Sequence, residues 1–363
     1  MALKARLLDM GTVSPLRSQS IFHALTACMQ PHSDIAVSLM RPNSQYVSIG
    51  YFQEAGVEVD LEYCRAQGLP VYRRHVGGGA VLLDGGQLFF HIMLPQARTG
   101  DIGLPHGLVQ RFAYLAGPAI EAYRKLGVEA TFRPINDIHV RGKKIGGTGV
   151  GEIEEGLVFA GSMMLDFDTA MMAKVLKVPD EKMRDKIADT LGNYMTTLKK
   201  ELGAAPPLDT VAGAIVSSIE EAFDLSLEPS LPTPEELEAM YEWDRRLSDE
   251  DWLHLIRLRE HPLREVKISA SVRILHAAHK APGGMIRATV RVVDGKIDEL
   301  LLSGDFPVSP MSALEELAAQ FAGARLDQAE LLDRIGQAFA GAGFELAGVT
   351  AGDFQTLFQQ IAP

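Results

Sequence analysis

Short runs of β-branched and aromatic residues, followed by one long amphipathic stripe, constrain the fold of this chain most strongly. The runs lie at Gln45–Gln53, Ala80–Leu83 and Leu88–Leu94, and an Asp-Gly-Gly turn separates the last two. We expect them to be strands of one sheet. Between His106 and Leu126, apolar residues recur at helical spacing, which predicts an amphipathic helix packed on that sheet. The pattern predicts an α/β protein of the α+β type.

Two domains are expected from the order of the remaining segments. Predicted helices and strands continue to a proline-rich connection at Glu228–Pro234, and a further helical stretch leads to His261-Pro262. We place the boundary there, with domains at 1–262 and 263–363. In the second domain, an Asp294-Gly295 pair between two apolar runs is a strong hairpin signal. The other elements expected are a helix over Ser14–Met29, strands within Asp137–Phe167, the hairpin strands Met285–Val293 and Ile297–Ser303, and helices over Ser312–Ala322 and Gln328–Ala340.

Composition excludes several classes of function. The 363 residues carry a formal net charge of −12, which argues against a general nucleic-acid affinity because such affinity comes largely from Lys and Arg. No apolar run reaches the roughly 18 residues of a membrane span, and the first segment has no continuous apolar stretch like that of a secretory signal. We therefore expect a cytoplasmic protein without membrane contact. Cys28 and Cys64 are too few for a disulfide framework, and no Cys or His cluster has zinc spacing.

The first unusual segment is RRHVGGGAV at residues 73–81, where a glycine turn behind two arginines enters a predicted strand. Glycine at Gly77, Gly78 and Gly79 removes every Cβ, so backbone N–H groups can approach a phosphate or carboxylate and form an anion-binding nest. The arginines add fixed positive charge. A tight turn with surface arginines has the same pattern, and the segment is neither a Walker loop nor a Gly-x-Gly-x-x-Gly fingerprint. Alone, it leaves both interpretations open.

The second unusual segment is NDIHVRGKKIGGTG at residues 136–149. An Asp at a strand start, with a Lys and small residues beyond it, suits a cavity where a nucleotide meets an acyl carboxylate. Lys144 would stabilise the negative charge that develops as an acid is adenylated. Asp137 would hold Mg²⁺, which prefers one or two carboxylates plus phosphate oxygens. The alternative is a charged hairpin with Lys143 and Lys144 in solvent.

Together, RRHVGGGAVLLDGGQL and RPINDIHVRGKKIGGTGV resemble the lipoate–protein ligase family in order and spacing. The resemblance extends upstream to RPNSQYVSIGYFQ and downstream to GLVFAGSMMLDFD, and it covers most of residues 30–200. The tail KAPGGMIRATVRVVDGKIDELLLSGDF looks like the accessory domain that some of these ligases carry on the same chain. The resemblance implies a mixed-sheet catalytic domain of the biotin/lipoate-ligase type and a small α+β C-terminal domain.

A two-step reaction is implied by the resemblance. Lipoic acid and Mg·ATP would give lipoyl-AMP, which a lysine of a lipoyl-acceptor domain then attacks. Such domains occur in 2-oxoacid dehydrogenase E2, glycine-cleavage H protein or similar carriers. Motif alignment makes Lys144 the catalytic lysine, in contact with both carboxylate and phosphate. The alignment assigns nucleotide or lipoate binding to Arg73, Gly77, Gly78, Gly79, Ala80, Val81, Asn136, Asp137 and Lys144.

Three positions depart from the family pattern. Leu83 and Ala160 stand where many members have histidine, and Gln87 stands where asparagine is usual. Neither of the first two can act as a general base. A more apolar wall would suit octanoate as well as lipoate, so the acyl preference stays open, as do the acceptor protein and the oligomeric state. His91 has no partner that the sequence identifies.

Other functions are weighed against the ligase. An octanoyl-carrier acyltransferase shares the fold but needs a thiolate in its site, and neither cysteine lies in the motif segments. A biotin ligase has arginines between the glycines of its loop, as in Gly-Arg-Gly-Arg, and no such string occurs here. A catalytically silent partner of lipoylated domains would not need the ATP site that Arg73, the glycine loop and Lys144 predict.

Overall fold

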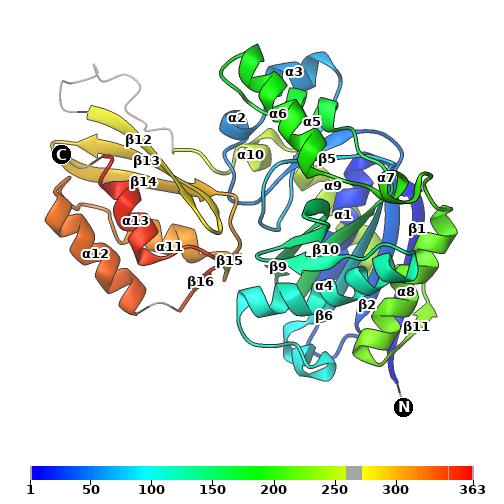
Figure 1. The fold of residues 1–363 in the computed structure, drawn as a ribbon. Coiled ribbons are helices and arrows are strands. Elements are labelled where there is room, and N and C mark those ends of the chain that lie inside the picture. The colour runs from blue at the N-terminus through cyan, green and yellow to red at the C-terminus, as the bar shows by residue number, and fades with distance from the viewer. Residues whose placement is uncertain (1, 259–271, 342, 362–363) are drawn as a thin grey trace.

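An eight-stranded mixed sheet organises the larger part of the residues described in the computed structural model, which are 2–258, 272–341 and 343–361 (Figure 1). Strand β1 pairs in parallel with β11 and β2, and the other neighbours are antiparallel. The predicted mixed sheet is therefore confirmed. In spatial order its strands are β11 (Leu225–Pro229), β1 (Leu3–Val13), β2 (Ala36–Pro42), β6 (Gln87–Pro95), β10 (Gly156–Met164), β9 (Lys143–Ile153), β8 (Asp137–Val140) and β7 (Thr131–Arg133).

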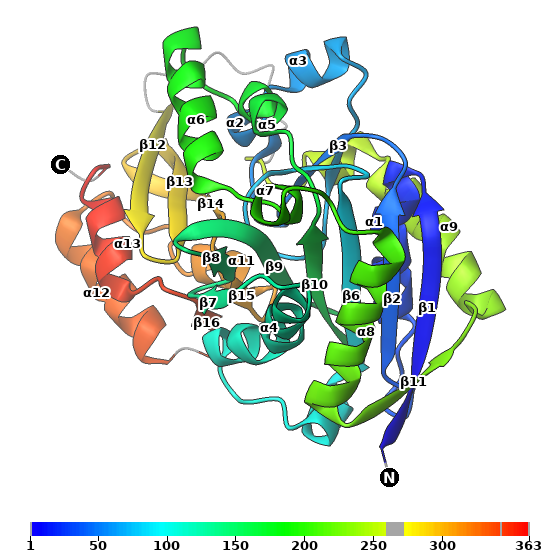
Figure 2. The ribbon, with the colours of Figure 1, turned by 45° about the vertical axis from the view of Figure 1, so that its right-hand side comes forward.

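Helices cover both faces of this sheet. Helices α4 (Leu108–Lys125) and α8 (Leu208–Phe223) pack on one face, and α1 (Pro15–Ala27) and α9 (Pro234–Leu247) lie on the other. Figure 2 shows α8 in front of the sheet, in nearly the same direction as its strands. Successive side chains of a strand point to opposite faces, so Phe90 joins the α4 and α8 core while Phe89 joins the α1 and α9 core. Strand β6 is consequently buried along its whole length.

A separate three-stranded sheet holds β3, and the prediction that all three apolar runs share one sheet is wrong. Its order is β4-β3-β5, whereas β6 belongs to the large sheet. Both edges of β6 are occupied, by β2 and β10, so β5 cannot pair with it. The small sheet contains β3 (Tyr46–Ile49), β4 (Val71–Arg73) and β5 (Val81–Leu83). The remaining helices of this part are α2 (Ala55–Glu58), α3 (Leu61–Ala66), η1 (Gln96–Ile102), α5 (Thr169–Val175), α6 (Glu181–Tyr194), α7 (Leu198–Leu202) and α10 (Glu250–Leu253).

The C-terminal part has a sheet and a hydrophobic core of its own. The predicted hairpin is confirmed, and Asp294 and Gly295 have φ of 50° and 76°, as a two-residue turn of this kind requires. The proposed boundary at 262/263 lies outside the described residues. The elements here are β12 (Val272–Ala281), β13 (Gly284–Val293), β14 (Lys296–Gly304), β15 (Val308–Ser309), α11 (Ala313–Ala319), α12 (Gln328–Ala340), β16 (Glu345–Leu346) and α13 (Ala351–Phe358). Among the described residues, no helix is both long and apolar enough to cross a membrane.

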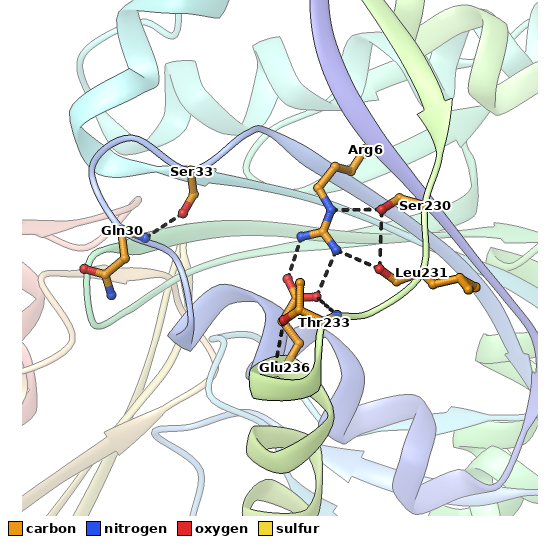
Figure 3. Close-up of polar contacts among 7 residues, drawn as sticks. All are labelled: Arg6, Gln30, Ser33, Ser230, Leu231, Thr233 and Glu236. Atoms are coloured by element: carbon orange, nitrogen blue, oxygen red, sulfur yellow. Dashed lines mark hydrogen bonds and ion pairs between the residues drawn. The ribbon is translucent and has the colours of Figure 1, made fainter.

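Arg6 on β1 joins the large sheet to the first turn of α9 (Figure 3). Its guanidinium lies 2.6 and 2.9 Å from the two carboxylate oxygens of Glu236, and it also donates to Leu231 O and Ser230 Oγ. Glu236 in turn accepts the backbone N–H of Thr233, which completes a capping box. This contact fixes where α9 starts, and α9 leads into the segment that supports the candidate site.

Arg6→Ala is expected to lower the free energy of unfolding by about 2 kcal/mol, because a half-buried bidentate ion pair and the order of the α9 N-terminus are lost together. Urea unfolding followed by circular dichroism measures this change. Lys4→Ala is the matched control, since Lys4 on the same strand pairs with Glu228 at the exposed surface, where solvent screens the ion pair and its loss should leave the free energy of unfolding nearly unchanged. Equal effects of the two substitutions would contradict the role of Arg6.

Candidate active site

The glycine loop, residues 77–80, connects β4 to β5 and rests on β9. Val76, at its start, packs on Gly149 and Gly151, and a Cβ at Gly151 would lie 2.6 Å from Val76 Cγ1. Arg74 holds the loop from beneath, because its Nη2 donates to Gly77 O at 2.9 Å and to Gly79 O at 2.8 Å. The loop is thus supported on two sides, and its shape does not depend on a ligand.

Four backbone donors of this loop are left unpaired. In the part of the chain that the structure describes, the amides of Gly77, Gly78, Gly79 and Ala80 donate to no acceptor. Backbone N–H groups in folded proteins are nearly always paired, and consecutive free amides form a concavity that binds anions. The loop therefore has the geometry of an anion-binding nest.

Lys144 lies at the start of β9, where its ammonium nitrogen is 2.7 Å from Asp137 Oδ1. The other carboxylate oxygen of Asp137 accepts the hydroxyl of Tyr194 at 3.4 Å. Gly147 leaves room for the lysine, since a Cβ at this position would lie 3.2 Å from Nζ. The ammonium is therefore paired with the Asp137 carboxylate and fits beside Gly147, where a side chain would contact it.

Asn136 forms hydrogen bonds to β9, the strand that carries Lys144. Its Nδ2 donates to Thr148 O at 3.0 Å, and the Thr148 hydroxyl donates back to Asn136 O at 2.9 Å. The side chain of Asn136 is thus occupied by the backbone of β9, and its role in the geometry of the site is to position that strand.

One cavity of about 290 Å³ joins the two predicted segments. The whole of Gly77–Val81 lines it, together with Asn136 and Lys144. Asp137 does not line the cavity and reaches it only through Lys144. The rest of the lining is mostly apolar and includes Phe22, Leu82, Leu83, Phe89, Ala160, Met164, Phe167, Met172, Leu191 and Met195. A fixed positive charge and free amides thus share one cavity with a mostly apolar lining, which suits an acid with an apolar chain.

Residues 14–220 match the family model of the lipoyl protein ligase A/B catalytic domain. The chain belongs to this family. Lipoate-protein ligase A subunit 1 of Thermoplasma acidophilum is 31% identical over 218 residues, which are 57% of this chain and 79% of that protein. The octanoyltransferase LipM of Kyrpidia tusciae is 28% identical over 228 residues, or 57% of this chain and 82% of the relative.

A solved structure has the same fold over most of the chain. It is that of a bipartite lipoate protein ligase and its E2 lipoyl domain from Thermoplasma acidophilum, with 28% identity and a TM-score of 0.63 over 72% of this chain and 99% of that chain. The catalytic domain of the lipoyl protein ligase A/B family thus spans the cavity and both motif segments. Among its curated relatives are both ligases and octanoyltransferases.

Arg73, predicted to bind nucleotide, does not line the cavity of this domain. Its side chain is 0% exposed, and its guanidinium donates to the backbone carbonyls of Gly50 and Tyr51 and of Trp252 and Leu253. Each of its three nitrogens donates to a backbone carbonyl, and the residue is not part of the cavity lining. The physical reason is the alternation of side chains along β4, which turns Arg73 toward α10 and Arg74 toward the glycine loop.

Several cavity residues of the domain were not predicted. Phe22 comes from α1, His91 from β6 and Met172 from α5, all outside the motif segments. The sequence carried no signal for them, because an apolar residue facing a cavity and one facing the core have the same pattern. Within the described residues, no group of three or more His, Cys, Asp or Glu side chains has the geometry of a metal site.

Proposed function

We propose that the chain is an ATP-dependent lipoate–protein ligase of the cytoplasm. One observation carries the proposal: four unpaired loop amides and the Lys144 ammonium belong to one cavity whose remaining lining is mostly apolar. The amides and the ammonium suit phosphate and carboxylate oxygens, and the apolar walls suit an acyl chain. The ligase among its relatives supports the same assignment.

In the first step, a carboxylate oxygen of lipoate attacks the α-phosphorus of ATP. The new P–O bond forms as the bond to pyrophosphate breaks, and lipoyl-AMP results. We assign to Lys144, which lines the cavity with the loop amides, contacts with both the acid and the phosphate, so that it stabilises charge that develops in the transition state. The loop amides hold phosphate oxygens without any movement of the loop, because Arg74 already fixes it.

Asp137, which lies behind Lys144 and not in the cavity lining, is the residue that would hold Mg²⁺. A carboxylate has about four acceptor sites, and the contacts of Asp137 with Lys144 and Tyr194 leave capacity for an ion. One protein carboxylate with phosphate oxygens is a donor set that Mg²⁺ accepts. The ion would neutralise the charge of the triphosphate.

In the second step, the amine of a lysine on a lipoyl-acceptor domain attacks the acyl carbon of the anhydride. The bond to AMP breaks, the amine loses a proton to solvent, and an amide remains. Because the acyl group is already activated, the enzyme needs mainly to position the amine. An E2 lipoyl domain is the class of acceptor that the related ligase structure supports.

A thioester octanoyltransferase is the second candidate, since one relative carries that activity in its name. It needs a reactive thiolate. Neither Cys28 nor Cys64 lines the cavity that contains Lys144, and burial raises the pKa of both thiols to about 11. A cysteine with a raised pKa is a poor nucleophile, and this observation favours the ligase.

Lipoate-dependent ATP–pyrophosphate exchange tests the choice between the two. The ligase incorporates labelled pyrophosphate into ATP when lipoate is present, and it retains this activity when both cysteines are replaced by serine. The transferase shows no exchange and loses acyl transfer from an octanoyl carrier in the same double variant. Absence of exchange in the unmodified protein would reject the ligase.

A further inference from the structure

A single histidine interrupts the apolar wall of the cavity. His91 lies directly opposite Ala160 across β6 and β10, and Ala160 lies opposite Gly149 across β10 and β9. The imidazole is therefore the large side chain of a row whose other two members are small. All three residues line the cavity, so Ala160 and Gly149 leave the ring uncovered on that side.

Among the described residues, only one nitrogen of this ring has a protein partner. Nδ1 of His91 lies 3.0 Å from Ser38 Oγ on the neighbouring strand β2. Nε2 has no hydrogen bond among the described residues, and this atom is not fully buried. The side chain is only 4% exposed, so the surface on which Nε2 opens is the cavity that the ring lines. A polar atom thus faces the apolar end of the site.

The surroundings of His91 favour a soft group as its ligand. The ring stacks on Phe22, with the ring centroids 4.7 Å apart and an angle of 21° between the ring planes. Burial lowers the pKa of His91 to about 3, so the ring is neutral at physiological pH and does not attract an anion. A divalent sulfur combines weak hydrogen-bonding capacity with favourable contacts to aromatic rings. Two aromatic surfaces and one neutral ring nitrogen therefore match a sulfur-bearing tail better than a plain alkyl tail.

The span from Lys144 to His91 agrees with this ligand. The Lys144 side chain runs along β9, because a Cβ at Gly147 would lie 3.2 Å from its ammonium nitrogen. Gly147 precedes Gly149 by two residues, which is about 7 Å along a strand, and His91 lies two strands from Gly149, about 10 Å across the sheet. The His91 side chain extends into the same cavity and shortens this distance. An acid whose carboxylate meets Lys144 thus places the end of an extended eight-carbon chain near His91.

We propose that His91, held by Ser38 and stacked on Phe22, contacts the dithiolane ring of lipoate and makes this chain prefer lipoate to octanoate. The inference rests on the proposed ligase function. It bears on the acyl preference, which the replacement of family histidines by Leu83 and Ala160 left open. His91, directly opposite Ala160 on the neighbouring strand, supplies an imidazole to the same cavity.

Competition between lipoate and octanoate for ATP-dependent acylation of an E2 lipoyl domain tests the proposal. The ratio of kcat/KM for the two acids is expected to favour lipoate in the unmodified protein and to fall about threefold to tenfold in His91→Phe. Phenylalanine keeps the stack on Phe22 and removes the ring nitrogens, so the change should appear mainly in the KM for lipoate. The double variant Ser38→Ala/His91→Phe removes the hydroxyl that would otherwise lose its partner, and should give the same ratio.

Met93→Leu is the matched control. Met93 lies on the same face of β6 as His91, two residues further on, but does not line the cavity, and the substitution conserves volume; the ratio should stay unchanged. An equal or greater preference for octanoate in the unmodified protein, or a ratio within twofold of it in the folded His91 variants, would overturn the proposal. No acylation with either acid in the unmodified protein would instead reject the ligase function.

Discussion

Lys144→Ala is expected to lower lipoate-dependent ATP–pyrophosphate exchange by at least about 10²–10³-fold, the loss typical when one preorganised donor to a developing charge is removed. The reason is that Lys144 lines the same cavity as the unpaired amides of the glycine loop. Removal of a partly exposed side chain should change the free energy of unfolding by less than about 1 kcal/mol.

Lys143→Ala is the control for this substitution. Lys143 is the preceding residue of β9, is exposed and does not line the cavity, so exchange should be retained. Both substitutions remove one positive charge from β9, so a difference between the two variants reports the position of the ammonium and not the total charge of the strand. Exchange within threefold of the unmodified rate in Lys144→Ala would show that the assignment of this lysine is wrong.

Arg73→Met is expected to lower the free energy of unfolding by about 3–5 kcal/mol. The substitution removes a donor from four backbone carbonyls, two on the segment after β3 and two in α10. Gly50 O and Trp252 O keep a backbone N–H donor, whereas Tyr51 O and Leu253 O have no other donor among the described residues. Each buried acceptor left unpaired carries a desolvation cost. Chemical denaturation measures the loss, and the bond from Trp252 Nε1 to Arg73 O makes indole fluorescence a local probe of it.

The affinity of the folded variant for ATP separates a structural role for Arg73 from a nucleotide-binding one. Calorimetry at low temperature should give an ATP affinity within threefold of the unmodified protein, because the guanidinium does not reach the cavity. Arg41→Met is the control for stability, since the Arg41 guanidinium has one partner, Thr12, at the surface. A large loss of ATP affinity at unchanged stability would restore the nucleotide-binding role predicted from the motif.

Local features of the fold were predictable because their causes lie within a few residues. The helix α4 follows from apolar residues at helical spacing, and the β13–β14 hairpin follows from one Asp-Gly pair. The turn at Asp84–Gly86 was also recognised. The sheets to which the two flanking strands belong were not predicted. Strands β5 and β6 enter different sheets because β2 and β10 occupy both edges of β6.

The same contrast applies to the candidate site. Both motif segments were found because glycines and a lysine pair are unusual in composition, and the structure brings Gly78 and Lys144 to one cavity. Which of two adjacent arginines faces the ligand depends on α10, about 180 residues away in the chain. His91 gains a possible role only from its cross-strand neighbours Ala160 and Ser38.

The sequence by itself determined the types of element, the anion-binding character of the glycine loop and the family that the motifs resemble. These depend on residue identity and short-range spacing. The tertiary structure alone decided that Arg73 is a buried support, that the apolar end of the cavity holds His91, and that neither cysteine reaches the reacting groups. Those properties arise from strand order and from side chains that meet across distant segments, and no local pattern specifies them.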